Sequence, residues 1–300
     1  MNKVSIRVPG TTANLGPGFD CLGVALRIYN YVTVSKVAKP RKPHTMVDEA
    51  AAAFFRFSGV KPFPFDWEIT GDVPTARGLG SSVTVRLGIL HGLNELSKRP
   101  LIRDDVFQLC AELEGHPDNA APAEFGGFAV AHNLEDGARC ITAPVSEDLK
   151  FVVLIPDFEV QTAAARRVMP KMIPHKEAVA SAINSTNIAA AFLYHQYELL
   201  RGCFTDYLHQ PYRQPLIPML PKVIAAGEKA GALGGFLSGS GSTIVCVTLK
   251  SAKKVADAML AAAGQIYACV LVTTADNEGA HPVLIETPKP TKAAGRKSKK

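Results

Sequence analysis

The sequence has few features that mark a metal-binding, secreted or membrane-spanning protein. It contains no C-x-x-C pair and no cluster of cysteine and histidine at the spacing of a metal site. No apolar run reaches the roughly 18 residues that a membrane-spanning helix needs, and no signal peptide is recognisable. Scattered thiols in such a chain are typical of a reduced, cytoplasmic protein, so we expect no membrane as a partner. The six cysteines are Cys21, Cys110, Cys140, Cys203, Cys246 and Cys269.

Two common nucleotide-binding patterns are also missing. No G-K-[ST] triplet occurs anywhere in the chain, which excludes a Walker A loop. No G-x-G-x-x-G occurs either, which argues against a Rossmann dinucleotide site. If the protein binds a nucleotide, it must do so with another kind of glycine-rich loop.

An excess of positive charge is absent from most of the chain. The formal net charge is +6, but residues 287–300 carry six basic residues and no acid, so residues 1–286 are neutral. A neutral body gives no reason to expect nucleic acid as a partner. The tail is rich in Lys, Pro, Ala and Gly, and we expect it to be disordered. A solvated tail that aids solubility is favoured over one that contacts nucleic acid or an anionic surface.

The composition is that of a globular protein with a substantial core. Of the 300 residues, 47% are hydrophobic and 20% are charged. At this length a single core usually stops growing, so we expect two closely packed halves with a boundary near residue 150.

Hydrophobic periodicity predicts a mixture of strands and helices. Strands are expected at residues 4–8, where Pro9 and Gly10 end the first, and at 31–34, 67–69, 128–131, 151–155, 234–237, 244–247 and, as the last, 269–272. Helices are expected at about 47–57, 83–93, 104–114, 176–200, 220–230 and 252–263.

The segment 74–82, Pro-Thr-Ala-Arg-Gly-Leu-Gly-Ser-Ser, has the physical character of a phosphate-binding loop. Its glycines let the backbone approach an anion, and the free N–H groups at the start of the following helix attract negative charge. The plain alternative is a glycine-rich turn with a serine helix cap. We expect a β-branched residue at Gly80 to abolish nucleotide binding and to leave the fold intact.

Together with two further segments, this loop resembles the three signature motifs of the GHMP kinases. The other two are residues 9–20, which read PGTTANLGPGFD, and residues 234–243, which read GGFLSGSGST. Within that superfamily the chain resembles the homoserine kinases, on residues 12–20, 114–123, 165–170 and 208–213. The similarity covers about residues 4–285. It departs at Val83-Thr84-Val85, where alanines are usual, and at Ser242, where proline is usual.

The resemblance implies an α+β, two-domain GHMP kinase fold. Residues 1–150 would form the nucleotide-binding N-terminal domain with the phosphate loop, and residues 151–286 a ferredoxin-like C-terminal domain. It also implies ATP-dependent phosphorylation of the side-chain hydroxyl of L-homoserine, giving O-phospho-L-homoserine in threonine biosynthesis. Two alternatives stay open: a GHMP kinase for another small alcohol, such as mevalonate, and a catalytically silent sensor that binds partner proteins. A homodimer is one option for its assembly.

The resemblance assigns the phosphates of ATP to the motif at residues 74–82, the second in chain order. It assigns Mg²⁺ to a serine of that motif together with a glutamate. We expect Ser81 or Ser82 as the hydroxyl ligand, and Glu112 in preference to Glu114, because Leu113 follows Glu112 as in the family pattern. The expected ATP-binding residues are Pro74, Arg77, Gly78, Leu79, Gly80, Ser81, Ser82, Val83 and Thr84.

A zwitterionic substrate needs a cation for its carboxylate and acceptors for its ammonium group, and arginine suits the former because its planar fork matches a carboxylate. Arg167 is the alternative to Arg166, and His116 could instead have only a structural role in its turn. We assign no general base, because the resemblance places Asn119 toward the substrate; Asp118 is the alternative. The expected substrate-binding residues are Asn14, Asp20, His116, Asn119, Arg166 and Arg213.

Overall fold

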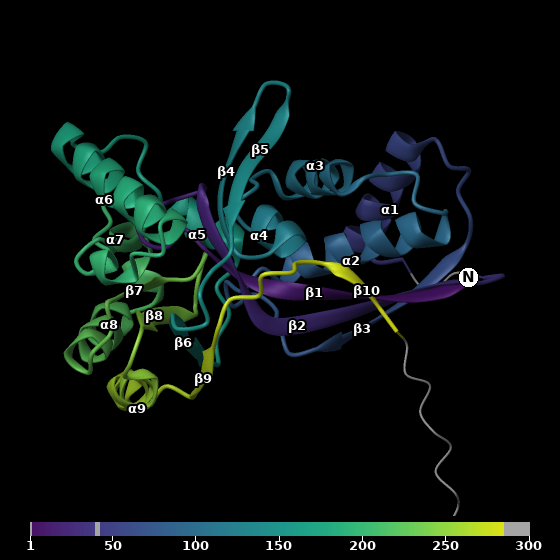
Figure 1. The fold of residues 1–300 in the computed structure, drawn as a ribbon. Coiled ribbons are helices and arrows are strands. Elements are labelled where there is room, and N and C mark those ends of the chain that lie inside the picture. The colour runs from purple at the N-terminus through teal and green to yellow at the C-terminus, as the bar shows by residue number, and fades with distance from the viewer. Residues whose placement is uncertain (1, 40–42, 285–300) are drawn as a thin grey trace, which may run out of the picture.

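The chain folds into two units of helices and strands that pack side by side (Figure 1). The structure is a computed structural model that describes residues 2–39 and 43–284. The predicted basic tail, residues 287–300, lies outside these ranges. None of the described helices is long and apolar enough to cross a membrane. All six cysteines are free thiols.

The first unit is an antiparallel sheet covered by helices on one face (Figure 1). Alternate residues of its first strand, Val4, Ile6 and Val8, join a core with these helices, as the period of two predicts. The strands are β1 (Lys3–Ala13), β2 (Leu22–Lys36), β3 (Phe65–Gly71), β4 (Phe128–Leu134), β5 (Gly137–Ala143) and β10 (His281–Val283). The order is β10-β1-β2-β4-β5, and β3 also pairs with β2. The helices are α1 (Thr45–Ser58), α2 (Ser81–Leu96), α3 (Arg103–Glu114) and α4 (Ala120–Phe125).

The second unit is a four-stranded antiparallel sheet in the order β7-β8-β6-β9. Its β-α-β-β-α-β succession, β6-α8-β7-β8-α9-β9, is the ferredoxin-like arrangement that the sequence predicted. The strands are β6 (Lys150–Pro156), β7 (Gly234–Leu237), β8 (Ile244–Thr248) and β9 (Ala268–Thr273). The helices are α5 (Thr162–Arg167), α6 (His175–Leu193), α7 (Gln210–Arg213), α8 (Leu220–Lys229) and α9 (Ala252–Ala263), with 3-10 turns η1 (Tyr197–Leu200) and η2 (Gln214–Leu216).

The two faces of the second sheet belong to different cores. Val152 and Leu154 of β6 pack with α8 and α9, whereas Phe151 and Val153 face α6 and also meet residues of β2 and β4, such as Leu26. Burial of this apolar surface stabilises the contact between the units. The two halves therefore share a core, and the space between them is fixed by packing.

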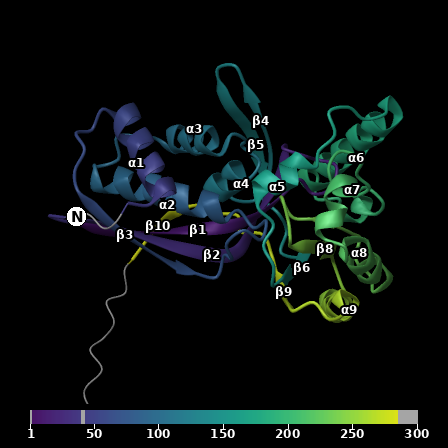
Figure 2. The same cartoon turned by 180° about the vertical axis from the view of Figure 1, so that it is seen from behind.

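The chain returns to the first unit at its end. After β9, the segment β10 pairs antiparallel with β1, with His281 opposite Arg7, and Figure 2 shows the two side by side. The sequence placed the last strand at 269–272 and the second domain at 151–286; residues 281–283 instead belong to the first sheet.

Two predicted boundaries also differ from the structure. The first strand does not end at Pro9; it continues through a register shift between Pro9 and Gly10 as far as Ala13. The helix expected over 176–200 ends at Leu193, because His195 adopts a left-handed φ of 56° that a helix cannot continue through.

The helix that follows the phosphate-loop motif, α2, lies at the centre of the first unit. Gly88 and Gly92 let it approach β2 closely, because a Cβ at either position would overlap the side chain of Val32 or Val34. This contact fixes the N-terminus of α2 relative to the sheet.

Candidate active site

A cavity of about 300 Å³ lies between the two units and is lined by segments of both. Most residues that the sequence singled out line it. These are Asn14, Asp20, Gly78, Gly80, Ser81, Ser82, Val83, Glu114, His116, Asp118, Asn119, Arg166 and Arg213. Five predicted residues do not line it: Pro74, Arg77, Leu79, Thr84 and Glu112.

The N-terminus of α2 opens onto this cavity. The helix begins at Ser81, directly after the glycine loop, and no side chain caps its first N–H groups. Ser81, Ser82 and Val83, which form its first turn, all line the cavity. The macrodipole of this 16-residue helix therefore makes the cavity wall favourable for an anion such as phosphate.

Two of the predicted nucleotide-binding side chains have partners within the protein. Thr84 is fully buried; its hydroxyl donates to the Ser81 carbonyl at 2.7 Å and accepts from Asn30 at 2.8 Å. The guanidinium of Arg77 lies within 3.4 Å of the carboxylates of Asp157 and Glu159. Both side chains are thus engaged by protein partners, and neither lines the cavity.

The loop glycines are required by the protein's own packing as well as by any phosphate. Gly78 and Gly80 have φ of 75° and 67°. A Cβ on Gly80 would overlap Thr11 Oγ1, and one on Gly78 would overlap the Ser238 carbonyl oxygen. The structure therefore argues against the expectation that a bulky residue at Gly80 would leave the fold intact.

Gly80→Ala is expected to lower the stability of the protein by about 2–3 kcal/mol, because left-handed strain of about 1 kcal/mol adds to the overlap with Thr11. Gly59→Ala is the matched control: its φ is 68°, and nothing lies within 4 Å of the added Cβ. It should lose only the strain. Urea unfolding of the two variants measures the difference, and equal losses would show that the space beside Gly80 does not matter.

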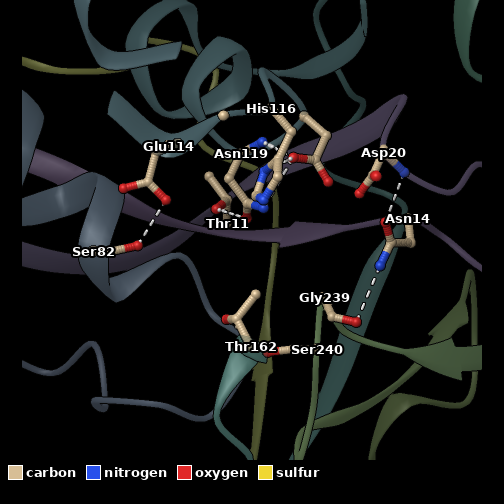
Figure 3. A network of polar contacts seen from close by, with 12 residues as sticks. Thr11, Asn14, Asp20, Ser82, Glu114, His116, Asn119, Thr162, Gly239 and Ser240 are labelled. Atoms are coloured by element: carbon tan, nitrogen blue, oxygen red, sulfur yellow. Dashed lines mark hydrogen bonds and ion pairs between the residues drawn. The ribbon is translucent and has the colours of Figure 1, made fainter. Parts of the chain in front are cut away.

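Glu114, the alternative in the sequence-based prediction, is the glutamate at the cavity. Its Oε2 accepts a hydrogen bond from Ser82 Oγ at 2.9 Å, which Figure 3 shows, and its Oε1 pairs with Arg86. Glu112 lies two residues back on α3, and its largely exposed side chain faces Arg56 at 3.8 Å. Glu112 does not line the cavity, because residues two apart on a helix do not share a face, so Glu114 is the better placed of the two for a ligand there.

Ser82 and Glu114 are a chemically suitable pair for Mg²⁺. No group of three or more His, Cys, Asp or Glu side chains is gathered as a metal site in the described ranges. Mg²⁺ does not need one, since it is commonly held by one or two carboxylates, waters and substrate phosphates. A hydroxyl and a carboxylate in contact beside a helix N-terminus fit that pattern.

The segment between α3 and α4 contributes a connected polar group. Asp118 is 2% exposed, and its Oδ1 accepts a hydrogen bond from the Asn119 backbone N–H at 3.0 Å and contacts His116 Nδ1 at 3.1 Å. Thr11 donates to Asn119 Oδ1 at 2.7 Å, which connects this segment to β1 (Figure 3). The hydrogen bond to Asp118 raises the pKa of His116.

Asn14 and Asp20 lie on the turn between β1 and β2. Asn14, at a left-handed φ of 72°, donates to the Gly239 carbonyl at 3.0 Å and accepts from the Asp20 backbone N–H at 3.0 Å (Figure 3). The Asp20 carboxylate pairs with both terminal nitrogens of Arg166, at 2.9 and 3.2 Å. The structure thus joins two predicted substrate-binding residues from different units.

Arg213 is the other predicted substrate arginine, and it is only 2% exposed. It donates to the carbonyls of Ala165 at 3.3 Å and Gly239 at 2.9 Å. Within residues 2–39 and 43–284, no carboxylate lies within 4.0 Å of its guanidinium, and its Nη2 has no hydrogen-bond partner. Burial lowers its pKa to about 10, so the group is still a cation at neutral pH.

Some cavity residues were not predicted. Gly239 and Ser240 belong to the third glycine segment, and Thr75 and Ala76 to the second, so the motifs contained a signal for them. Gln161 and Thr162 had no such signal. Thr162 lies at the start of α5, with its hydroxyl 3.4 Å from that of Ser240 (Figure 3).

Comparison with known proteins is consistent with this geometry. The family model "GHMP kinases N terminal domain" matches residues 45–127, and "GHMP kinases C terminal" matches residues 188–265. The chain is 38% identical to a homoserine kinase of Aquifex aeolicus over 92% of this chain and 98% of that one. It is 39% identical to a homoserine kinase of Carboxydothermus hydrogenoformans, over 81% and 84%. The crystal structure of homoserine kinase from Cytophaga hutchinsonii superposes with a TM-score of 0.87 at 27% identity, over 94% and 98%.

Proposed function

The chain belongs to the homoserine kinases of the GHMP kinase superfamily, and from this we propose that it transfers the γ-phosphoryl group of ATP to the side-chain hydroxyl of L-homoserine. The observation that carries the proposal is the cavity itself. A helix N-terminus suited to phosphate and an unpaired buried guanidinium suited to a carboxylate both line it.

We propose that L-homoserine binds on the side of the cavity formed by Arg213, Arg166 and Asp20. A buried cation without a carboxylate partner is costly unless a ligand supplies one, since desolvation penalises an unpaired charge. Arg213 therefore suits the substrate carboxylate. Asp20 supplies negative charge for the substrate ammonium group, beside Asn14 and Asn119.

The phosphates of ATP lie, in this proposal, against Gly78 to Val83 at the N-terminus of α2, with Ser82 and Glu114 holding Mg²⁺. When bound, the ion neutralises phosphate charge. The residues of this chain position the two substrates and exclude water, which accounts for most of the catalysis when the transition state is loose.

No general base is assigned. Asp118, the alternative, lines the cavity, but its Oδ1 is already contacted by His116 and by the backbone and side-chain nitrogens of Asn119. The Asn119 side chain also accepts from Thr11. This segment is better suited to holding Asn119 in place than to taking a proton. A cytoplasmic location and a homodimer stay predictions.

The test is release of ADP that depends on L-homoserine. The purified protein should release ADP from MgATP with L-homoserine, and much more slowly with 3-aminopropanol, which lacks the carboxylate, or 4-hydroxybutyrate, which lacks the ammonium group. Faster turnover with mevalonate would favour a GHMP kinase for another alcohol. Absence of turnover with every alcohol, despite ATP binding in a calorimetric titration, would favour a silent sensor.

A further inference from the structure

A buried histidine lies directly behind Arg213. His209, at the N-cap of α7, has no exposed surface and does not line the cavity. Its Nε2 is 2.8 Å from the Gly16 carbonyl oxygen in the turn after β1, and its Nδ1 is 3.3 Å from Arg213 Nη1. It therefore connects the motif at residues 9–20 to Arg213, the arginine that we propose binds the substrate.

The chemistry of these partners fixes the state of the ring. A carbonyl oxygen only accepts, so Nε2 carries the hydrogen. A guanidinium only donates, so Nδ1 must offer a lone pair to Arg213. His209 is thus neutral and in a single tautomer. Consistently, burial lowers its pKa to about 4.

One neighbouring charge opposes the neutral state: the Asp206 carboxylate raises the pKa of His209, but by less than burial lowers it. Asp206, whose Oδ2 lies 3.4 Å from Nε2, accepts hydrogen bonds from the backbone N–H groups of Leu208, His209 and Gln210 at 2.6–3.0 Å. Its charge is thereby satisfied at the start of α7.

Phe19 completes the support of the guanidinium. Its ring stacks on His209 with a centroid separation of 5.1 Å and 21° between planes, and it lies 5.0 Å from Arg213 Cζ. Arg166 Cζ is 5.7 Å from the same ring. Two cations share this ring and repel each other, so Arg213 needs fixed acceptors to keep one orientation.

Nε and Nη1 of Arg213 are engaged by Ala165, Gly239 and His209, which leaves Nη2 for the cavity. We propose that His209 is a positioning residue: as a neutral acceptor it holds the Arg213 guanidinium so that its free edge meets the substrate carboxylate. This role rests on the proposed function, since it presumes that Arg213 binds the carboxylate of L-homoserine.

The experiment is a double-mutant cycle between His209 and Arg213. Two substitutions of His209 are used, because each removes only one of its two hydrogen bonds, to Gly16 or to Arg213. In His209→Gln the amide can reach the former Nε2 position and Gly16, but no acceptor remains for Arg213. In His209→Asn the amide oxygen can replace Nδ1 and accept from Arg213, but the bond to Gly16 is lost. Each is measured alone and in the Arg213→Leu background, with L-homoserine and ATP varied.

We expect His209→Gln to raise KM for L-homoserine about tenfold, the effect of one charge-assisted hydrogen bond, with KM for ATP changed less than about twofold. His209→Asn should retain most of the affinity. In the Arg213→Leu background, His209→Gln should change kcat/KM less than about twofold, because a residue that acts only through Arg213 has no further effect.

Additive losses in the two backgrounds, or parallel rises in both KM values, would overturn the positioning role and leave His209 a structural residue. If His209→Gln does not fold, His209→Asn is compared in the wild-type and Arg213→Leu backgrounds instead. A loss of kcat/KM that is equally large in both backgrounds would come from the lost bond to Gly16 and would overturn the positioning role. The wild-type protein is the reference. If it shows no L-homoserine-dependent turnover, the proposed function fails and the positioning role with it.

Discussion

Glu114→Gln is expected to lower kcat for L-homoserine phosphorylation by about a hundredfold or more. The carboxylate touches Ser82 beside the N-terminus of α2, where we propose that both hold Mg²⁺. Replacing a charged ligand by an amide weakens the neutralisation of phosphate charge, an effect of about 3 kcal/mol or more. Steady-state rates over a range of Mg²⁺ concentrations measure it, and the Mg²⁺ requirement should rise.

Two control variants make this result specific. Glu112→Gln changes the exposed neighbour on α3 and should leave both kcat and the Mg²⁺ requirement unaltered. Glu49→Gln removes the other carboxylate that Arg86 contacts, at 3.0 Å, without touching the cavity, so it reports any effect that comes only from disturbing Arg86. If kcat falls further in Glu112→Gln than in Glu114→Gln, the sequence-based preference for Glu112 as the Mg²⁺ ligand would be the right one.

Arg213→Leu is expected to lower kcat/KM for L-homoserine about ten- to a hundredfold or more. A charge-assisted hydrogen bond contributes about 1.5–3 kcal/mol, and about 1.4 kcal/mol corresponds to a factor of ten. KM for ATP should barely change, because we propose that the phosphates bind at the N-terminus of α2, on the other side of the cavity from Arg213. Arg213→Lys should recover only part of the loss, since an ammonium group cannot present a planar fork.

Arg167→Leu is the matched control for that result. Arg167 is exposed and does not line the cavity, so its removal should leave L-homoserine saturation unchanged. Thermal unfolding of each variant separates substrate binding from stability, which matters because Arg213 is buried. If saturation by L-homoserine is unchanged in Arg213→Leu, this arginine does not bind the substrate. The proposal that the substrate is L-homoserine and not another small alcohol would then lose one of its supports.

The choice between Glu112 and Glu114 shows what a linear motif leaves open. Both acids precede the His-Pro-Asp-Asn segment and both lie on α3. Residues two apart on a helix point in directions about 200° apart, given 3.6 residues per turn. Which of them faces Ser82 depends on how α3 is rotated against α2, and that rotation is set by packing.

Arg77 and Thr84 show a second limit of the sequence. Arg77 lies in the segment 74–82 and Thr84 two residues after it, and both have side chains that could contact a phosphate. Their partners in the structure, Asp157 and Asn30, are distant in sequence. No local pattern shows that these partners will be adjacent, so membership of a motif did not establish a role in the cavity.

The sequence by itself determined the family, the α+β class, the glycine loop before α2 and most of the residues that line the cavity, because these depend on local periodicity, glycine chemistry and motif order. Only the tertiary structure decided which glutamate reaches Ser82, that β10 returns to β1, and that His209 lies behind Arg213. Each of these contacts joins residues brought together by packing of the two units or by rotation of a helix. Such contacts are fixed by the burial of apolar surface over the whole chain, and no short segment encodes them.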